Sequence, residues 1–123
     1  MRYRSFMQKQ ISIASNGVKL FGRDGEPRGG IYEDGKENDI YIRLTSTKAK
    51  GTYRPFNWGL LLDAFESMLD GIQPYSTGET VPLLGLRVYD VFIREGIYIL
   101  AAEGILGKTQ SILGTRPIVV GQL

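Results

Sequence analysis

The 123-residue chain contains no cysteine and no histidine, and these two absences exclude several chemistries. Without cysteine there is no disulfide framework, and without either residue there is no zinc site of the usual Cys/His kind. The same absences exclude a Ser-His-Asp triad and a Cys-His nucleophile. An enzyme built on this chain would have to take its acid–base groups from carboxylates. We therefore expect no metal site and no cofactor.

The chain also has little net charge and no long apolar run. The chain has fifteen basic and thirteen acidic residues. The resulting net charge of +2 does not by itself indicate binding to nucleic acid or to a membrane surface. The apolar run at 97–102 is far shorter than the roughly 20 residues that cross a bilayer, and the basic N-terminus lacks the apolar core of a signal peptide. We expect a soluble protein, located in the cytoplasm or, if this is a mature chain, secreted.

The length indicates a single domain over 1–123, and one segment in it predicts a helix. That segment is FNWGLLLDAFESMLDG (56–71), and it predicts an amphipathic helix over about 57–70. Asn57 suits the N-cap and Gly71 suits the left-handed position after the last turn. Apolar residues recur at helical spacing through this segment and just beyond it. They are Trp58, Leu61, Leu62, Phe65, Met68, Leu69 and Ile72.

The remaining patterns predict about six strands in antiparallel hairpins. In QISIASNGVKLFG (10–22), Asn16 and Gly17 suit a two-residue type I′ turn, which predicts a hairpin. Its core face would consist of Ile11, Ile13, Val18 and Leu20. The segment 40–45 alternates with Ile40, Ile42 and Leu44 inward, and 83–104 reads as a second hairpin with a turn at 94–96. A last strand is expected at 118–120. The predicted fold is α+β, with one helix packed on an antiparallel sheet.

The polar face of the predicted helix carries three carboxylates, Asp63, Glu66 and Asp70, and no basic residue. One interpretation is an ordinary solvated face, because exposed charges contribute little. The other is a contact with a basic surface. Charge is segregated along the chain, since residues 1–30 and 43–54 are each net +4 while 33–39 and the helix are each net −3. We therefore predict a non-enzymatic, self-associating or partner-binding protein that acts through charged surfaces and edge strands.

The first alternative is binding of single-stranded nucleic acid through the basic segments 1–28 and 43–54. Basic residues with interleaved aromatics contact phosphates and stack on bases. The candidates in the second segment are Lys48, Lys50, Tyr53 and Arg54. Trp58 and Phe56 are assigned to the core, which leaves Tyr53 as the free stacking residue.

Two further alternatives rank last. AEGILGKT (102–109) fits a phosphate-loop pattern in which Gly107, Lys108 and Thr109 would hold a nucleotide. The pattern must open a helix, however, and Gly114 and Pro117 interrupt the segment that follows. A carboxylate-based hydrolase would need an acid such as Asp90, which shares the parity of apolar strand positions.

The stretch NWGLLLDAFESML (57–69) resembles a Trp-Gly-x-x-x-Asp-Ala helix of small, functionally uncharacterised fungal proteins, many of them secreted. The likeness covers about a dozen residues around Trp58, Gly59, Asp63 and Ala64. It implies an α+β domain and carries no site residues over to this chain.

Overall fold

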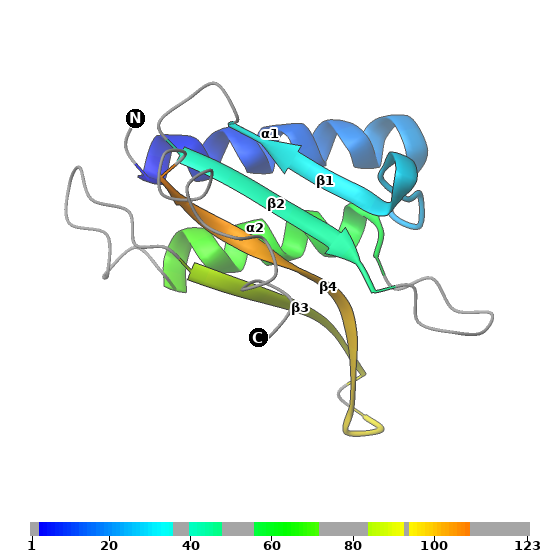
Figure 1. The fold of residues 1–123 in the computed structure, drawn as a ribbon. Helices are drawn as coiled ribbons and strands as arrows, with labels where there is room; N and C mark the ends of the chain where they lie inside the picture. The colour runs from blue at the N-terminus through cyan, green and yellow to red at the C-terminus, as the bar shows by residue number, and fades with distance from the viewer. Residues whose placement is uncertain (1–2, 36–39, 48–55, 72–83, 93, 109–123) are drawn as a thin grey trace.

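The structure is a computed structural model that describes residues 3–35, 40–47, 56–71, 84–92 and 94–108 (Figure 1). Within these ranges the chain forms two α-helices, a short 3₁₀ helix and four strands. Their bounds are α1 (Tyr3–Phe21), η1 (Arg28–Gly30), β1 (Ile31–Asp34), β2 (Ile40–Ser46), α2 (Trp58–Gly71), β3 (Leu84–Phe92) and β4 (Ile97–Lys108). Neither helix is both long enough and apolar enough to cross a membrane.

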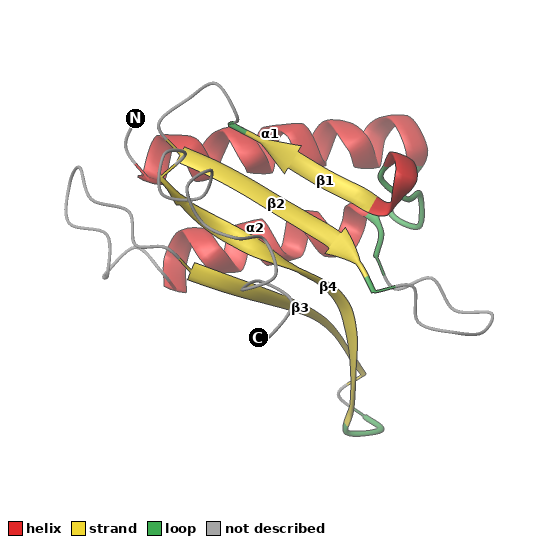
Figure 2. Cartoon of the chain, viewed as in Figure 1, coloured by secondary structure: helices red, strands yellow, loops and turns green. Residues whose placement is uncertain are grey.

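The four described strands form one antiparallel sheet in the order β1-β2-β4-β3 (Figure 2). The hairpins β1–β2 and β3–β4 are joined at the centre by the pairing of β2 with β4, so β1 and β3 are the edges. Both helices cover the same face of the sheet (Figure 1). The predicted α+β class is confirmed. The prediction of about six strands is wrong for the described residues, and the strand expected at 118–120 lies outside them.

The predicted N-terminal hairpin is wrong, because residues 3–21 form the single helix α1, and so is the prediction of only one helix. The buried residues of α1 repeat at helical spacing from the start of the helix. They are Tyr3, Phe6, Met7, Gln10, Ala14 and Gly17. The alternation in 11–20 is a short local pattern, and Leu20, assigned to its core face, is 73% exposed.

Packing rather than a turn explains the glycine of the Asn16-Gly17 pair. A Cβ on Gly17 would overlap the ring of Trp58, with Cε2 only 2.8 Å away. Gly17 therefore lets the first turn of α2 lie directly against α1. The Tyr3 hydroxyl donates to the carbonyl of Met68 at the other end of α2 (2.7 Å), so the two helices run antiparallel.

An Asn16→Ala substitution distinguishes the helix from the predicted hairpin. Asn16 is exposed in the interior of α1, where alanine has the higher helix propensity, so we expect the free energy of unfolding to rise by about 0.5 kcal/mol. In a type I′ turn the same change would lower stability, because alanine disfavours positive φ. Urea denaturation followed by circular dichroism measures the sign. A destabilised variant would contradict the helix.

The prediction of a helix over 57–70 is confirmed by α2. The side chain of Asn57 caps it, since Asn57 Oδ1 accepts a hydrogen bond from the amide of Leu60 (2.8 Å). Leu61 and Phe65 are fully buried against the sheet. On β2, Ile40, Ile42 and Leu44 point inward as expected, and they complete the same core.

A cluster of hydrogen-bonded polar side chains connects α1 to β1. Gln10 is completely buried, and its Oε1 accepts a hydrogen bond from the Tyr32 hydroxyl (2.5 Å) while its Nε2 donates to Asp34 Oδ2 (2.7 Å). Lys9 Nζ lies 3.2 Å from the same carboxylate oxygen. Both ends of the buried amide are thus satisfied, which is the condition for a polar group to lie in a core.

The predicted second hairpin is confirmed as β3–β4, and it contains a bulge. Val88 pairs with Ala102 but Tyr89 pairs with Leu100, so Ala101 is an extra residue on β4. Beyond the bulge the hairpin extends past the helix layer (Figure 1), and no described residue between 89 and 100 belongs to the buried core. We call residues 89–100 the arm. Apolar side chains in the arm are exposed, and Tyr98 is 68% exposed.

Candidate functional site

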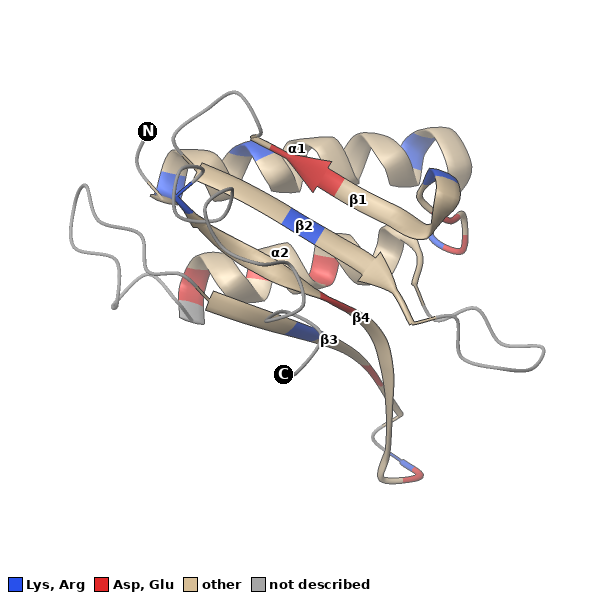
Figure 3. Ribbon diagram, viewed as in Figure 1, with Lys and Arg blue, Asp and Glu red and all other residues tan. Residues whose placement is uncertain are grey.

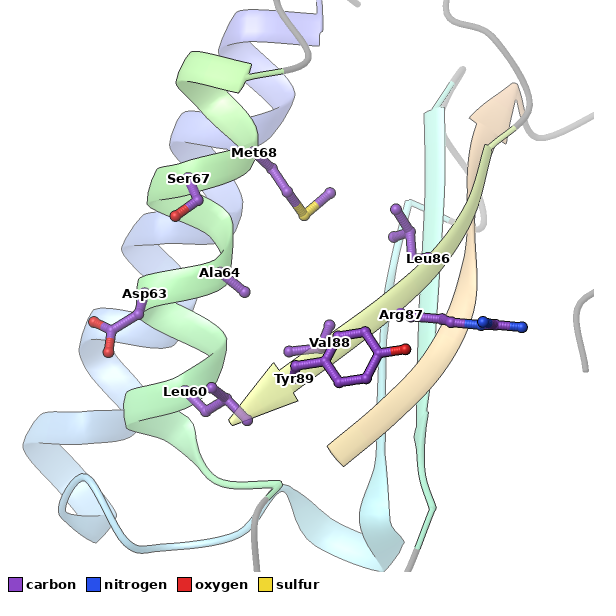
Figure 4. Close-up of a pocket in the computed structure, with 9 residues that line it drawn as sticks. All are labelled: Leu60, Asp63, Ala64, Ser67, Met68, Leu86, Arg87, Val88 and Tyr89. Atoms are coloured by element: carbon purple, nitrogen blue, oxygen red, sulfur yellow. The ribbon is translucent and has the colours of Figure 1, made fainter. Parts of the chain in front are cut away.

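An open groove separates α2 from the edge strand β3, with a volume of about 290 Å³ (Figure 4). Leu60, Ala64 and Met68 form the wall on α2, and Leu86 and Val88 form the wall on β3. The figure shows these five side chains directed into the space between the helix and the strand. The interior of the groove is therefore apolar.

Helical spacing explains which residues reach the groove. Leu61 and Phe65 face the sheet and are fully buried, whereas Leu60, Ala64 and Met68 follow each other at i, i+4 and i+8 on the flank toward β3. All three are only partly buried. The side chain of Ala64, in the middle of this flank, is small, so it leaves free space at the centre of the groove wall.

Polar side chains surround the groove without entering it. Asp63 and Ser67 lie on the outer side of α2, and Figure 4 shows Asp63 pointing away from the strand. Arg87 and Tyr89 belong to the opposite rim, on β3. Arg87 Nε lies 3.9 Å from Glu103 Oε1 of the neighbouring strand, which places the guanidinium on the sheet face that the helices leave uncovered.

The backbone of β3 forms the outer boundary of the site. In the described part of the chain, β3 pairs with β4 on one side and with no strand on the other. It is nine residues long, against four for the other edge strand, β1. It contains no proline or lysine, and Tyr89 and Val91 on it are 41% and 43% exposed. A long edge strand with apolar side chains is a template for another strand.

The carboxylates predicted as an interface are all exposed residues of α2, and Figure 3 shows acidic positions along that helix. The sequence did not show whether a basic residue contacts Asp63. In the structure Arg23 does, because its Nη2 lies 2.7 Å from Asp63 Oδ2. Both side chains are more than half exposed, so this pair contributes little stability. Glu66 and Asp70 are exposed and make no ion pair with the residues that the structure describes.

The structure places two of the three nucleotide candidates in a strand rather than a phosphate loop. Gly107 and Lys108 are the last residues of β4, paired with Tyr41 and Ile40, and Thr109 lies outside the described residues. The catalytic candidate Asp90 is half-buried in the arm, opposite Ile99, and it takes part in an interaction. The metal-binding side chains of the described ranges form no cluster of three or more.

The nucleic-acid candidates Lys48, Lys50, Tyr53 and Arg54 lie outside the described residues. In the other basic segment, Lys9 is paired with Asp34 and Arg23 with Asp63. These two pairs neutralise part of the positive charge that the segment 1–28 was expected to offer to phosphates.

Three tyrosines have a raised pKa, one on α1, one on β1 and one on β2. Burial raises the pKa of Tyr3 to about 12. Burial raises the pKa of Tyr41 to about 12 as well, and its hydrogen bond to Glu33 acts in the same direction. The pKa of Tyr32 is also raised, by burial and then by the nearby Asp34 charge. At neutral pH these hydroxyls therefore serve as hydrogen-bond donors.

No protein-family model, curated protein or solved structure matches the chain. The geometry of the β3 edge and its groove therefore carries the functional interpretation. Sequence reasoning missed this site because it assigned only one apolar stripe to the helix. Leu60 and Ala64 fall outside that stripe. These additional apolar residues were the signal in the sequence that a second side of the helix is apolar.

Proposed function

We propose that the chain is a non-enzymatic binding protein that holds an extended segment of a partner along β3. The observation that carries the proposal is the nine-residue edge strand with an apolar groove beside it. Main-chain hydrogen bonds to β3 would supply affinity, and alternate side chains of the segment would enter the groove and supply selectivity.

The spacing of the groove residues supports this mode. Alternate residues of a strand are about 6.6 Å apart, and residues four apart on a helix rise by about 6 Å. The intervals between Leu60, Ala64 and Met68 therefore match the repeat of the side chains that a strand would direct at α2. A β-branched or leucine side chain of the bound segment, facing Ala64, would fill the space that this small residue leaves free.

The polar residues at the rim also favour binding over catalysis. Asp63 is engaged by Arg23 and points away from the groove, and Arg87 lies on the opposite face of the sheet. Among the described residues that line it, the groove thus gathers no convergent acid and base that would act on a bound molecule.

The test is a titration of the ¹⁵N-labelled full chain with a capped peptide of alternating threonine and valine, seven residues long. We expect the amide shifts to change along β3 and the adjacent flank of α2. A peptide with proline at alternate positions, which lacks the required donors, serves as the control. An absence of binding, or shifts confined to β1, would overturn the proposal.

A pair of variants tests the groove itself. Ala64→Trp fills the groove from its low point, and we expect peptide affinity to fall by about tenfold or more, as expected when a buried side chain loses its site. Ser12→Trp places the same side chain at an exposed position of α1 and should leave affinity unchanged. Both spectra first establish that the fold is kept. Equal affinity for the two variants would exclude the groove.

A further inference from the structure

We infer that the segment received by β3 is selected by an acidic side chain opposite Arg87, placed between two apolar side chains that enter the groove. This inference rests on the proposed function, because it names the class of segment that the same edge binds. The segment pairs antiparallel with residues 84–89 of β3, and it belongs to a partner protein.

The contacts of β3 limit the segment to residues 84–89. Apart from the pairing with β4, the backbone of these residues makes no hydrogen bond to the described part of the chain. Asp90 and Phe92 have further interactions of their own, and the arm to which they belong extends past the helix layer (Figure 1). The free edge and the groove therefore coincide only along the first part of β3.

The two apolar positions follow from the alternation of the strand. Leu86 and Val88 face the helix layer, so the residues opposite them point the same way, beside the apolar flank of α2 (Figure 4). From Leu60 to Met68 this flank rises by about 12 Å, the length of about four residues of strand. It therefore accommodates two successive inward side chains of the bound segment.

The side chain between these two lies on the uncovered face of the sheet, next to Arg87. Directly opposite residues have Cβ atoms about 5 Å apart, so an aspartate or glutamate there can reach the guanidinium. The side chain of Arg87 is 42% exposed, and its Nε lies 3.9 Å from Glu103 Oε1, which is longer than a hydrogen bond. Because a guanidinium has several N–H donors, it can bind a second carboxylate without releasing Glu103.

The other charged residue that lines the groove does not select for a basic side chain. Asp63 Oδ2 lies 2.7 Å from Arg23 Nη2, and the same nitrogen donates to the carbonyl of Gly59 (3.3 Å). Asp63 also points away from the strand. The charge of Asp63 is thus engaged by a short ion pair, whereas that of Arg87 has only a long one. The charge that remains available to the bound segment is positive.

Two capped peptides that differ in one residue test the selection. They are Thr-Val-Glu-Val-Thr-Val-Thr and Thr-Val-Lys-Val-Thr-Val-Thr, each titrated into the ¹⁵N-labelled full chain at low salt. We expect the glutamate peptide to bind about three- to tenfold more tightly, because its carboxylate pairs with Arg87 whereas the lysine is repelled. The difference should shrink at high salt, since the pair is exposed to solvent.

Variants of Arg87 assign the preference to this residue. Arg87→Gln should bring the two affinities together, and Arg87→Glu should reverse their order. Arg94→Glu makes the same change of charge at an exposed position in the turn of the arm, and it should keep the order of the wild-type chain. The spectra of all variants first establish that the fold is kept.

The outcomes separate this inference from the proposed function. Equal binding of both peptides at β3, or an order that Arg87→Gln leaves unchanged, would overturn the inference and leave the proposed function standing. A reversal by Arg94→Glu as well would show that net charge rather than Arg87 selects, which also overturns the inference. If neither these peptides nor the threonine–valine peptide bound at β3, both would be overturned.

Discussion

A Gly104→Ala variant is expected to lose about 3 kcal/mol or more of its free energy of unfolding, because the new methyl group would overpack the centre of the sheet. Gly104 lies on β4 opposite Leu44 of β2. A Cβ there would overlap the carbonyl oxygen of Arg43 and lie 2.9 Å from the Cα of Leu44. Both obstacles are backbone atoms, so no side-chain rotation relieves them. The two central strands would have to separate, in a domain whose total stability is about 5–15 kcal/mol.

Urea denaturation followed by circular dichroism measures this loss. Gly85→Ala is the matched control, since Gly85 is an exposed strand residue on β3, and its effect should stay within about 0.5 kcal/mol. If Gly104→Ala unfolded at the same urea concentration as the wild-type chain, the close pairing of β2 and β4 at this point would be contradicted.

A Gln10→Ala variant is expected to lose about 2–4 kcal/mol, through a cavity and two broken hydrogen bonds. Gln10 is fully buried, and its amide joins the Tyr32 hydroxyl to Asp34. After truncation, the Tyr32 hydroxyl would be left without its acceptor beneath the helix layer. The loss would fall on the contact between α1 and the edge strand β1.

Two comparisons separate the causes of this loss. Gln8→Ala removes the same amide from an exposed position of α1, and it should change stability by less than about 0.5 kcal/mol. Tyr32→Phe removes only the hydroxyl and should lie between the two variants, at about 1–2 kcal/mol. Equal stabilities of the Gln8 and Gln10 variants would show that the buried amide does not connect the helix to the sheet.

The sequence was sufficient to predict α2 because its local signals agree. The cap at Asn57, the apolar period and the final glycine all select the same residues, and Asn57 does cap the helix. The inward parity of Ile40, Ile42 and Leu44 was predictable for a similar reason, since a strand with one buried face repeats every second residue.

The N-terminal helix was not predictable by the same reasoning because its decisive signals conflict. Asn16-Gly17 and the alternating isoleucines favour a hairpin locally, whereas the helical period becomes visible only when Tyr3, Phe6 and Gln10 are included. The reason for Gly17 is also non-local, since it accommodates Trp58, some 40 residues further along the chain. Tertiary packing decided between two local structures of similar propensity.

The candidate site depends on tertiary structure even more strongly. The groove brings together Leu60 and Val88, which only the placement of α2 beside the last hairpin makes neighbours. Strand order could not be read from the alternation of β3, so the sequence left open which strand forms the edge. Of the acidic row on α2, which the sequence did identify, only Asp63 belongs to the groove lining, and its side chain points away from the strand.

Because Trp58 packs on Gly17, its fluorescence can be used to follow the folding of the chain. Trp58 is the only tryptophan, and its ring stacks on Phe21 of α1 (centroids 6.3 Å apart) and meets Tyr32 of β1 edge-on (6.1 Å). Its fluorescence therefore follows a single event, the docking of α2 against α1 and β1. A shift in emission that precedes the loss of strand signal would identify a state in which the helix layer has separated from an intact sheet.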